Sequence, residues 1–312
     1  MTALLVAVIY VALQFRADMK AARTAVNGYA TLEVDTSFGR IELVDQGDGF
    51  PVLSIHGTGG GFDQGTALAE ALLQNDYRVI APSRFGYLGT PVPERNDAVA
   101  QADAFVEMLD ALGIETTVVM GTSAGAITAL HFAARHPERT AALLAMVPAY
   151  YPPGQAAPEP WSPLKTWAVT TALQSDFLFW AGLKLFPSRV LATVLATDSG
   201  LIEAADAAER TRLHALVGMI VPISARADGL MLDAQNTAAP SVVDLASITV
   251  PTFIASAEDD HYRTADSARL LARAITGAEL LITPDGGHVW VGRSGEIEAA
   301  VAAFLEQALS PP

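Results

Sequence analysis

The chain of 312 residues contains no cysteine, and its basic residues are few, with 19 Lys and Arg against 34 Asp and Glu. Without cysteine it can form no disulfide, no thiolate nucleophile and no Cys-ligated zinc site. The net charge of -15 repels phosphate backbones, so nucleic acid is not expected as a partner. Hydrophobic residues nevertheless make up 51% of the chain, which excludes an intrinsically disordered protein.

Part of the apolar excess lies at the amino terminus. The first 15 residues carry no side-chain charge, and residues 3–13 are all Ala, Leu, Val, Ile or Tyr. As a helix this run would be about 22 Å long, short of the ~30 Å hydrocarbon core of a bilayer. A membrane anchor over residues 1–23, a poor signal peptide and a helix packed on the protein are the three interpretations. The anchor is favoured because the run has no polar face, and the basic residues that follow it favour a cytoplasmic body.

Beyond the amino terminus, apolar β-rich segments alternate with helical ones, which is typical of an α/β fold with a mostly parallel sheet covered by helices on both faces. Helices are expected over residues 96–112, 124–135, 265–275 and 296–309. Strands are expected over residues 40–44, 52–55, 77–81, 116–120, 141–147, 248–255 and 279–282.

One stretch interrupts the alternation, because no convincing buried strand occurs between about residues 152 and 240. It begins with a cluster of prolines and continues with aromatic residues at helical spacing. A helical insertion between two strands predicts a cap over the site. We therefore expect a core of residues 30–150 and 241–312, with a helical cap over residues 151–240. The cap tryptophans and one histidine that follows a strand are the predicted substrate contacts: Trp161, Trp167, Trp180 and His56.

The segment from Gly121 to Gly125 has the pattern G-x-S-x-G, with Ser123 at its centre. A predicted strand leads into it and an Ala-rich helix leads out. The two glycines allow a tight turn that lifts the serine hydroxyl above the sheet, at the amino terminus of the helix. Ser123 is therefore the predicted nucleophile, in preference to a simple helix cap.

A serine hydroxyl needs a base to take its proton and an acid to orient that base. His288 follows the late strand over residues 279–282 and is the predicted base. The acid should follow the strand over residues 248–255, where Asp259 and Asp260 both stand. Strand ends alone do not separate these two aspartates.

The negative charge that develops on the substrate oxygen needs backbone N–H donors, an oxyanion hole. One expected donor is Ala124, directly after the nucleophile. The other is Thr58 or Gly59, in the glycine-rich loop after the strand over residues 52–55. That loop completes neither G-x-G-x-x-G nor a Gly-Lys-Ser/Thr motif, so no nucleotide is expected. No cofactor and no metal are expected in the site.

Together these motifs resemble the α/β-hydrolase fold family, over roughly residues 30 to 309. The order Ser, Asp, His is that of the family. Its acid loop commonly runs V-P-T, four residues, then G-x-x-D, which aligns with Val250 onward and places Asp260 at the acid position. Two departures are Ala257 at the glycine position and Thr264 where proline is common. Relatives that open epoxides or displace halides have aspartate in place of serine, so the resemblance implies acyl transfer instead.

The resulting expectation is a serine hydrolase that acts on a carboxylic ester or related small acyl substrate through an acyl-enzyme. The aromatic cap and the lack of a basic cluster favour an apolar, uncharged substrate. Two alternatives use the same triad, an acyltransferase and a hydrolase of carbon–carbon bonds. A third is a membrane-tethered ligand-binding protein with little turnover.

Overall fold

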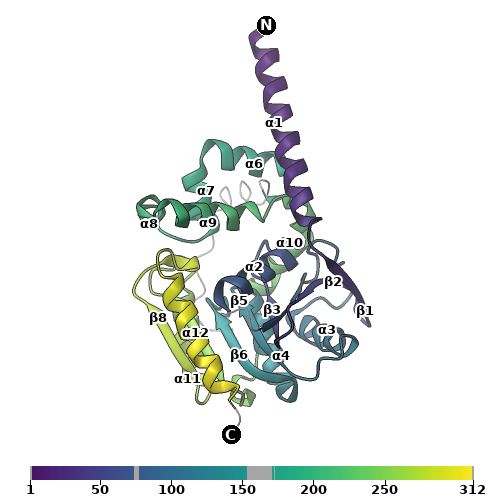
Figure 1. Ribbon diagram of the computed structural model, residues 1–312, viewed down its shortest axis with the longest axis vertical. Helices are drawn as coiled ribbons and strands as arrows, with labels where there is room; N and C mark the ends of the chain where they lie inside the picture. Colours follow the sequence, from purple (N-terminus) through teal and green to yellow (C-terminus); the bar gives the residue numbers. More distant parts are fainter. Residues whose placement is uncertain (1, 74–76, 153–170, 172, 311–312) are drawn as a thin grey trace.

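The computed structural model describes residues 2–73, 77–152, 171 and 173–310, and its centre is one eight-stranded sheet (Figure 1). The strand order is β1-β2-β4-β3-β5-β6-β7-β8. The first two strands pair antiparallel, and β2 pairs antiparallel with β4; all other pairs are parallel. The strands are β1 (Thr31–Thr36), β2 (Gly39–Gln46), β3 (Phe50–Ile55), β4 (Tyr77–Pro82), β5 (Thr117–Thr122), β6 (Thr140–Met146), β7 (Thr252–Ala257) and β8 (Glu279–Thr283).

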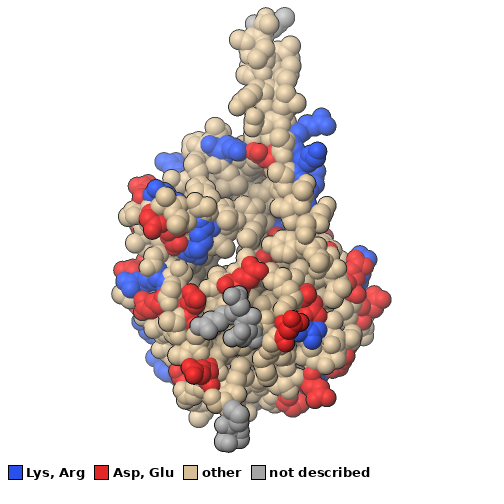
Figure 2. All heavy atoms as spheres, in the orientation of Figure 1, with Lys and Arg blue, Asp and Glu red and all other residues tan. Residues whose placement is uncertain are grey.

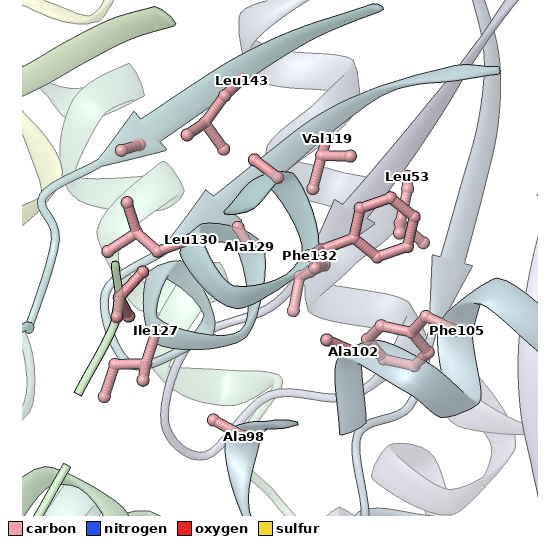
Figure 3. Close-up of a cluster of buried hydrophobic side chains, with 14 of the residues drawn as sticks. Leu53, Ala98, Ala102, Phe105, Val119, Ile127, Ala129, Leu130, Phe132 and Leu143 are labelled. Carbon is pink, nitrogen blue, oxygen red and sulfur yellow. The ribbon is translucent and has the colours of Figure 1, made fainter. Parts of the chain in front are cut away.

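Helices cover both faces of this sheet. The outer helices are α2 (Phe62–Leu72), α3 (Ala98–Ala111), α4 (Gly125–Arg135), α11 (Thr264–Ala274) and α12 (Ser294–Ala308). On one face, α3, α4 and α11 pack on the strands, and Figure 3 shows Phe132 of this layer beside Leu53 and Val119, with Phe105 and Ile127 in the same cluster. On the other face, α2 and α12 pack on the opposite sides of the same strands. Every residue of β5 and β7 is buried, as two covered faces require.

The predicted α/β fold with a mostly parallel sheet is therefore confirmed, but two elements were not predicted. The edge strand β1 has a polar, exposed pattern, and α2 contains a glycine in its first turns, so neither gives a strong signal. The strand expected over residues 248–255 begins instead at Thr252, because Pro251 has no N–H to donate. A short 3-10 helix, η3 (Leu245–Ser247), precedes it.

Between β6 and β7 the described residues form helices joined by turns, and Figure 1 shows these helices above the carboxyl edge of the sheet. The first four of the described helices, here called the cap helices, share a hydrophobic cluster with Met19 of α1 and Val291. The segment then returns to the core through η2 and α10. The cap helices are α6 (Asp176–Leu185), α7 (Pro187–Val194), α8 (Ser199–Ala204) and α9 (Ala207–Gly218), and the returning elements are η2 (Ile223–Arg226) and α10 (Ala227–Ala238).

The amino-terminal helix α1 (Thr2–Val26) projects away from the body (Figure 1). Met19 is its one buried residue. In its second half, Phe15 packs edge-on against Phe177 and Trp180 of α6, with ring centroids 5.4 Å apart in each pair. The helix is longer than the uncharged run and continues through the basic residues that follow it. By length and composition it could cross a membrane.

Candidate active site

Ser123 lies in the tight turn between β5 and α4, with a left-handed backbone φ of 55°. A non-glycine residue in this region is strained, and such strain is concentrated at functional sites. The turn is held because Ser123 N donates to Met146 O at 2.9 Å. The flanking glycines are needed for close approach: a Cβ at Gly121 would lie 2.5 Å from the Ala129 side chain, and one at Gly125 would lie 2.4 Å from His56 O.

The glycine-rich loop after β3 lies against this turn. A Cβ added at Gly57 would lie 3.2 Å from Ser123 Cβ. Within the loop, Gly59 N donates to the Tyr87 hydroxyl at 3.2 Å. Among the hydrogen bonds of the described residues, none uses Thr58 N. The Thr58 N–H therefore has no hydrogen-bond partner among the described residues, whereas the Gly59 N–H is already engaged.

The structure joins His288 to Asp260. His288 Nδ1 lies 2.7 Å from Asp260 Oδ2, and the Asp260 side chain has no exposed surface. The other carboxylate oxygen accepts from Tyr262 N at 2.8 Å. The Thr264 hydroxyl donates to Asp260 Oδ2 and is itself 2.8 Å from Ser256 Oγ. His288 is thus held by a carboxylate that is fixed on both oxygens.

The same contacts keep this carboxylate ionised. Burial alone would raise the pKa of Asp260, but the charge of His288 and the hydrogen bonds from His288, Thr264 and Tyr262 outweigh it, so the pKa lies below its ordinary value. A negative carboxylate at neutral pH favours the Nδ1–H tautomer of His288. That tautomer leaves Nε2 free to accept a proton.

The neighbouring aspartate has a different position. Asp259 accepts from the backbone N–H groups of Gly286 and Gly287, at 3.3 and 2.8 Å. It therefore shapes the loop that carries His288 and does not contact the imidazole ring by a hydrogen bond. The hydrogen bonds thus distinguish two aspartates that strand ends alone left equivalent, and the one bonded to His288 is Asp260, the residue that the family resemblance favoured.

Ser123, Asp260 and His288 follow β5, β7 and β8, so all three lie at the carboxyl edge of the sheet. None of the hydrogen bonds between described residues joins Ser123 to His288. Catalytic hydrogen bonds are often long in unliganded enzymes and shorten only when substrate binds. The carboxylate and the imidazole are therefore already assembled, while the contact between serine and imidazole is not formed.

A buried polar network lies behind the glycine-rich loop. His56 has no exposed surface; its Nε2 accepts from Arg84 N at 3.0 Å and its Nδ1 lies 2.7 Å from Gly57 O. Burial, followed by the positive charge of Arg84, lowers the pKa of His56 far below its ordinary value. His56 is therefore neutral and supports the loop from within, which differs from its predicted role as a substrate contact.

Two buried arginines extend this network, and each is paired. Arg84 forms a two-pronged pair with Asp233 of α10, at 2.6 and 2.7 Å, and also donates to Gly57 O at 3.0 Å. The Tyr87 hydroxyl donates to Asp233 Oδ2 at 2.5 Å. Separately, Arg226 of η2 pairs with Asp63 at 2.6 Å and donates to Gly60 O. The elements that return from the cap thus hold the loop at Gly57, Gly59 and Gly60.

Trp180, a predicted substrate contact, lies on α6 and packs against α1. Its Nε1 donates to Asp18 of α1 at 2.8 Å, so it belongs to the junction between these helices. Trp161 and Trp167, also predicted contacts, lie outside the described residues. The sequence did not predict that Thr264 would donate to Asp260, or that Arg84 and Asp233 would support the glycine-rich loop. The only sequence signal for these residues is that Arg84 follows the carboxyl end of a strand.

Across the described residues, no group of three or more His, Asp or Glu is placed to hold a metal ion.

Known proteins resemble this chain in both sequence and fold. The family model described as alpha/beta hydrolase fold matches residues 51–291. A 2-hydroxymuconate semialdehyde hydrolase from Pseudomonas putida is 39% identical over 110 residues, which are 34% of this chain and 39% of that protein. The match therefore spans well under half of that relative's length.

Two solved structures share the fold. An alpha/beta hydrolase fold protein from Nakamurella multipartita is 27% identical, with a TM-score of 0.70 over 90% of this chain and 100% of the other. A bacterial membrane phospholipase A is 20% identical, with a TM-score of 0.68 over 99% of this chain and 98% of the other. With the family match, the sheet order and the serine turn taken together, the chain belongs to the α/β-hydrolase fold family.

Proposed function

We propose that the protein is a serine hydrolase that cleaves a carboxylic ester or related acyl substrate through an acyl-enzyme on Ser123. The hydrogen bond between His288 and the buried Asp260, next to the strained serine turn, is the observation that carries the proposal. Ser123 Oγ bonds to the acyl carbon while its proton moves to His288 Nε2. The alcohol then leaves with that proton, and water repeats the sequence to release the acid.

In this mechanism the Ala124 and Thr58 N–H groups hold the oxyanion. Ala124 is the N-cap residue of α4, so its N–H lies at the positive end of the helix. The proposal assigns the second donor to Thr58 because Gly59 N donates to Tyr87. Removing one such donor typically costs about 100- to 1000-fold in kcat.

An uncharged substrate fits the described part of the site best. Both buried arginines close to the glycine-rich loop are neutralised, Arg84 by Asp233 and Arg226 by Asp63. Neither has a free charge to offer a substrate carboxylate. The helices above the carboxyl edge would form the cap, and the predicted boundaries at residues 151 and 240 remain part of this proposal.

Hydrolysis of a carbon–carbon bond is the second candidate. It is favoured by the identity with 2-hydroxymuconate semialdehyde hydrolase. The two reactions can be separated by supplying 2-hydroxymuconate semialdehyde and p-nitrophenyl esters to the same preparation. Faster turnover of the semialdehyde would favour this second candidate over the ester hydrolase.

The direct test of the proposal is Ser123→Ala, assayed with p-nitrophenyl butyrate. Loss of the nucleophile should lower kcat by at least about 1000-fold, with unchanged circular dichroism. Ser188→Ala, which alters an exposed serine of α7, is the matched control and should retain full activity. Equal ester turnover by the Ser123→Ala and Ser188→Ala variants would exclude Ser123 as the nucleophile.

We further propose that α1 anchors the protein in a membrane. Its length and hydropathy are sufficient, and nearly all of its surface is exposed. Arg16, Lys20 and Arg23 follow the uncharged run and favour a cytoplasmic position for the body.

A further inference from the structure

The large hydrophobic side chains that are exposed in the described part of the chain concentrate on two elements. Eight belong to the first half of α1, between Leu4 and Leu13. Four more lie on α6 or directly after it: Phe177 (44% exposed), Leu178 (45%), Leu185 (69%) and Phe186 (56%). Leu178 and Leu185 are seven residues apart and therefore share one face of α6. An apolar face of this kind on a water-facing helix calls for a partner.

The structure fixes this face of the cap relative to α1. Asp18 of α1 accepts from Trp180 Nε1 at 2.8 Å and pairs with Lys184 Nζ at 2.9 Å. Phe15 packs against Phe177 and Trp180 one turn earlier on α1. These contacts join α1 to α6 at the point where the uncharged run ends. A medium or partner that surrounds the run therefore also lies next to α6.

Exposed basic side chains gather at this junction, although Lys184 is paired with Asp18. The chain has a net charge of -15, yet Arg16 and Lys20 on α1 and Lys184 and Arg189 in the cap are all exposed. Figure 2 shows Lys and Arg gathered on both sides of α1 where it leaves the cap, above a body that carries many acidic side chains. Phospholipid head groups of anionic membranes attract such basic clusters.

We propose that this surface of α6, defined by Phe177, Leu178, Leu185 and Phe186 with its flanking basic residues, rests on an anionic phospholipid bilayer. The proposal depends on the anchoring role of α1 proposed above. From Arg16 back to Thr2, α1 is about 21 Å long, which covers most of a ~30 Å hydrocarbon core. Insertion of that run places Arg16, Lys20 and the cap at the level of the head groups. The apolar side chains of α6 then enter the interface, as in other interfacial helices.

The chain contains no cysteine, so a spin label attached to one introduced cysteine reports on that position alone. No native cysteine has to be replaced first. A nitroxide would be attached at Leu185→Cys, and at Gln307→Cys as the matched control. Gln307 is exposed on α12, at the end of the body far from α1 (Figure 1). Both proteins would be reconstituted into vesicles of phosphatidylcholine with phosphatidylglycerol, and floated to confirm binding.

The reference is the same labelled protein in detergent-free buffer without vesicles. On anionic vesicles, we expect the nitroxide at residue 185 to collide severalfold less often with a water-soluble nickel complex than in this reference. Its collisions with oxygen should become more frequent. The nitroxide at residue 307 should not change. Protection should be weaker on phosphatidylcholine alone. Protein that floats while residue 185 remains as accessible to nickel as residue 307 would contradict the surface, although the anchor would stand.

Three other results would also overturn the proposal, each for a different reason. Reduced collision with both nickel and oxygen at residue 185 would indicate a second copy of the chain on this surface. Equal protection on both lipid compositions would exclude a preference for anionic lipid. Failure to float would remove the anchor itself. None of these outcomes depends on ester turnover, so the hydrolase proposal is tested separately.

Discussion

Asp260, which contacts the imidazole of His288, is itself held by other groups. The Thr264 hydroxyl and Tyr262 N–H occupy its two oxygens, and Ser256 in turn contacts Thr264. Thr264 stands where relatives often have proline, which has no hydroxyl to donate. This chain therefore fixes its acid through a side chain that the resemblance alone gave no reason to expect.

The first prediction concerns this hydroxyl. Thr264→Val keeps the shape of the side chain and removes the donor to a buried carboxylate, a hydrogen bond worth about 1.5–3 kcal/mol. We expect kcat for p-nitrophenyl butyrate to fall roughly tenfold or more, with KM nearly unchanged. Thr264→Ser should restore most of the rate, because it returns the hydroxyl. Wild-type kcat in Thr264→Val, in protein of normal thermal stability, would show that Asp260 needs no such support.

At the scale of single residues, the sequence was sufficient where a motif is local. The motif around Ser123, which directly follows β5, and the position of His288, in the loop after β8, could both be recognised from local sequence. The choice between Asp259 and Asp260, and between Thr58 and Gly59, depends on contacts with distant residues. Gly59 N donates to the Tyr87 hydroxyl, and Asp259 accepts from the loop before His288. Composition and strand ends do not contain that information.

Among the described helices, α10 supports the site through contacts with the loop after β4. It approaches the loop after β4 so closely that Gly229 N donates to Gly86 O at 2.9 Å, and a Cβ at Gly229 would lie 2.2 Å from the Tyr87 ring. Asp233 then reaches Arg84 and Tyr87, which contact the glycine-rich loop. Asp233 is a positioning residue for the loop that carries the proposed oxyanion donor.

The second prediction tests this link. Asp233→Asn leaves Arg84 as a buried cation without its counter-charge, and breaking a buried pair in this way costs about 3–5 kcal/mol. We expect a lower unfolding temperature and a reduced kcat, because the loop at Gly57 and Gly59 loses its support. Asp228→Asn, at an exposed site on the same helix, should change neither.

If the Asp233→Asn variant matched the Asp228→Asn variant in both measurements, the network would have no role in holding the loop. No sequence pattern could have identified this pair, because Asp233 lies 149 positions from Arg84. The strands of the sheet were predictable for the opposite reason. A parallel strand buried on both faces is a continuous apolar run, whereas the edge strand β1 is exposed and polar and was missed.

At the scale of the whole molecule, the exposed apolar side chains are not spread evenly over the acidic surface. Most of the large ones lie on α1 and around α6, where Figure 2 shows Lys and Arg on both sides of α1. The sequence predicted the apolar amino terminus, but not that α1 would extend to Val26 and lock onto the cap through Asp18 and Phe15. The helix continues because the charged residues after the run are good helix formers.

If Ser123 is a nucleophile activated by His288 and Asp260, a fluorophosphonate probe should react with it. We expect rapid, near-stoichiometric phosphonylation of the full chain, located at Ser123 by peptide mass spectrometry. Labelling should be lost in Ser123→Ala and strongly slowed in His288→Gln. A folded protein that the probe does not label, or that it labels at the same rate in His288→Gln, would show that Ser123 is not activated by this triad. The absence of labelling would favour a membrane-tethered ligand-binding protein.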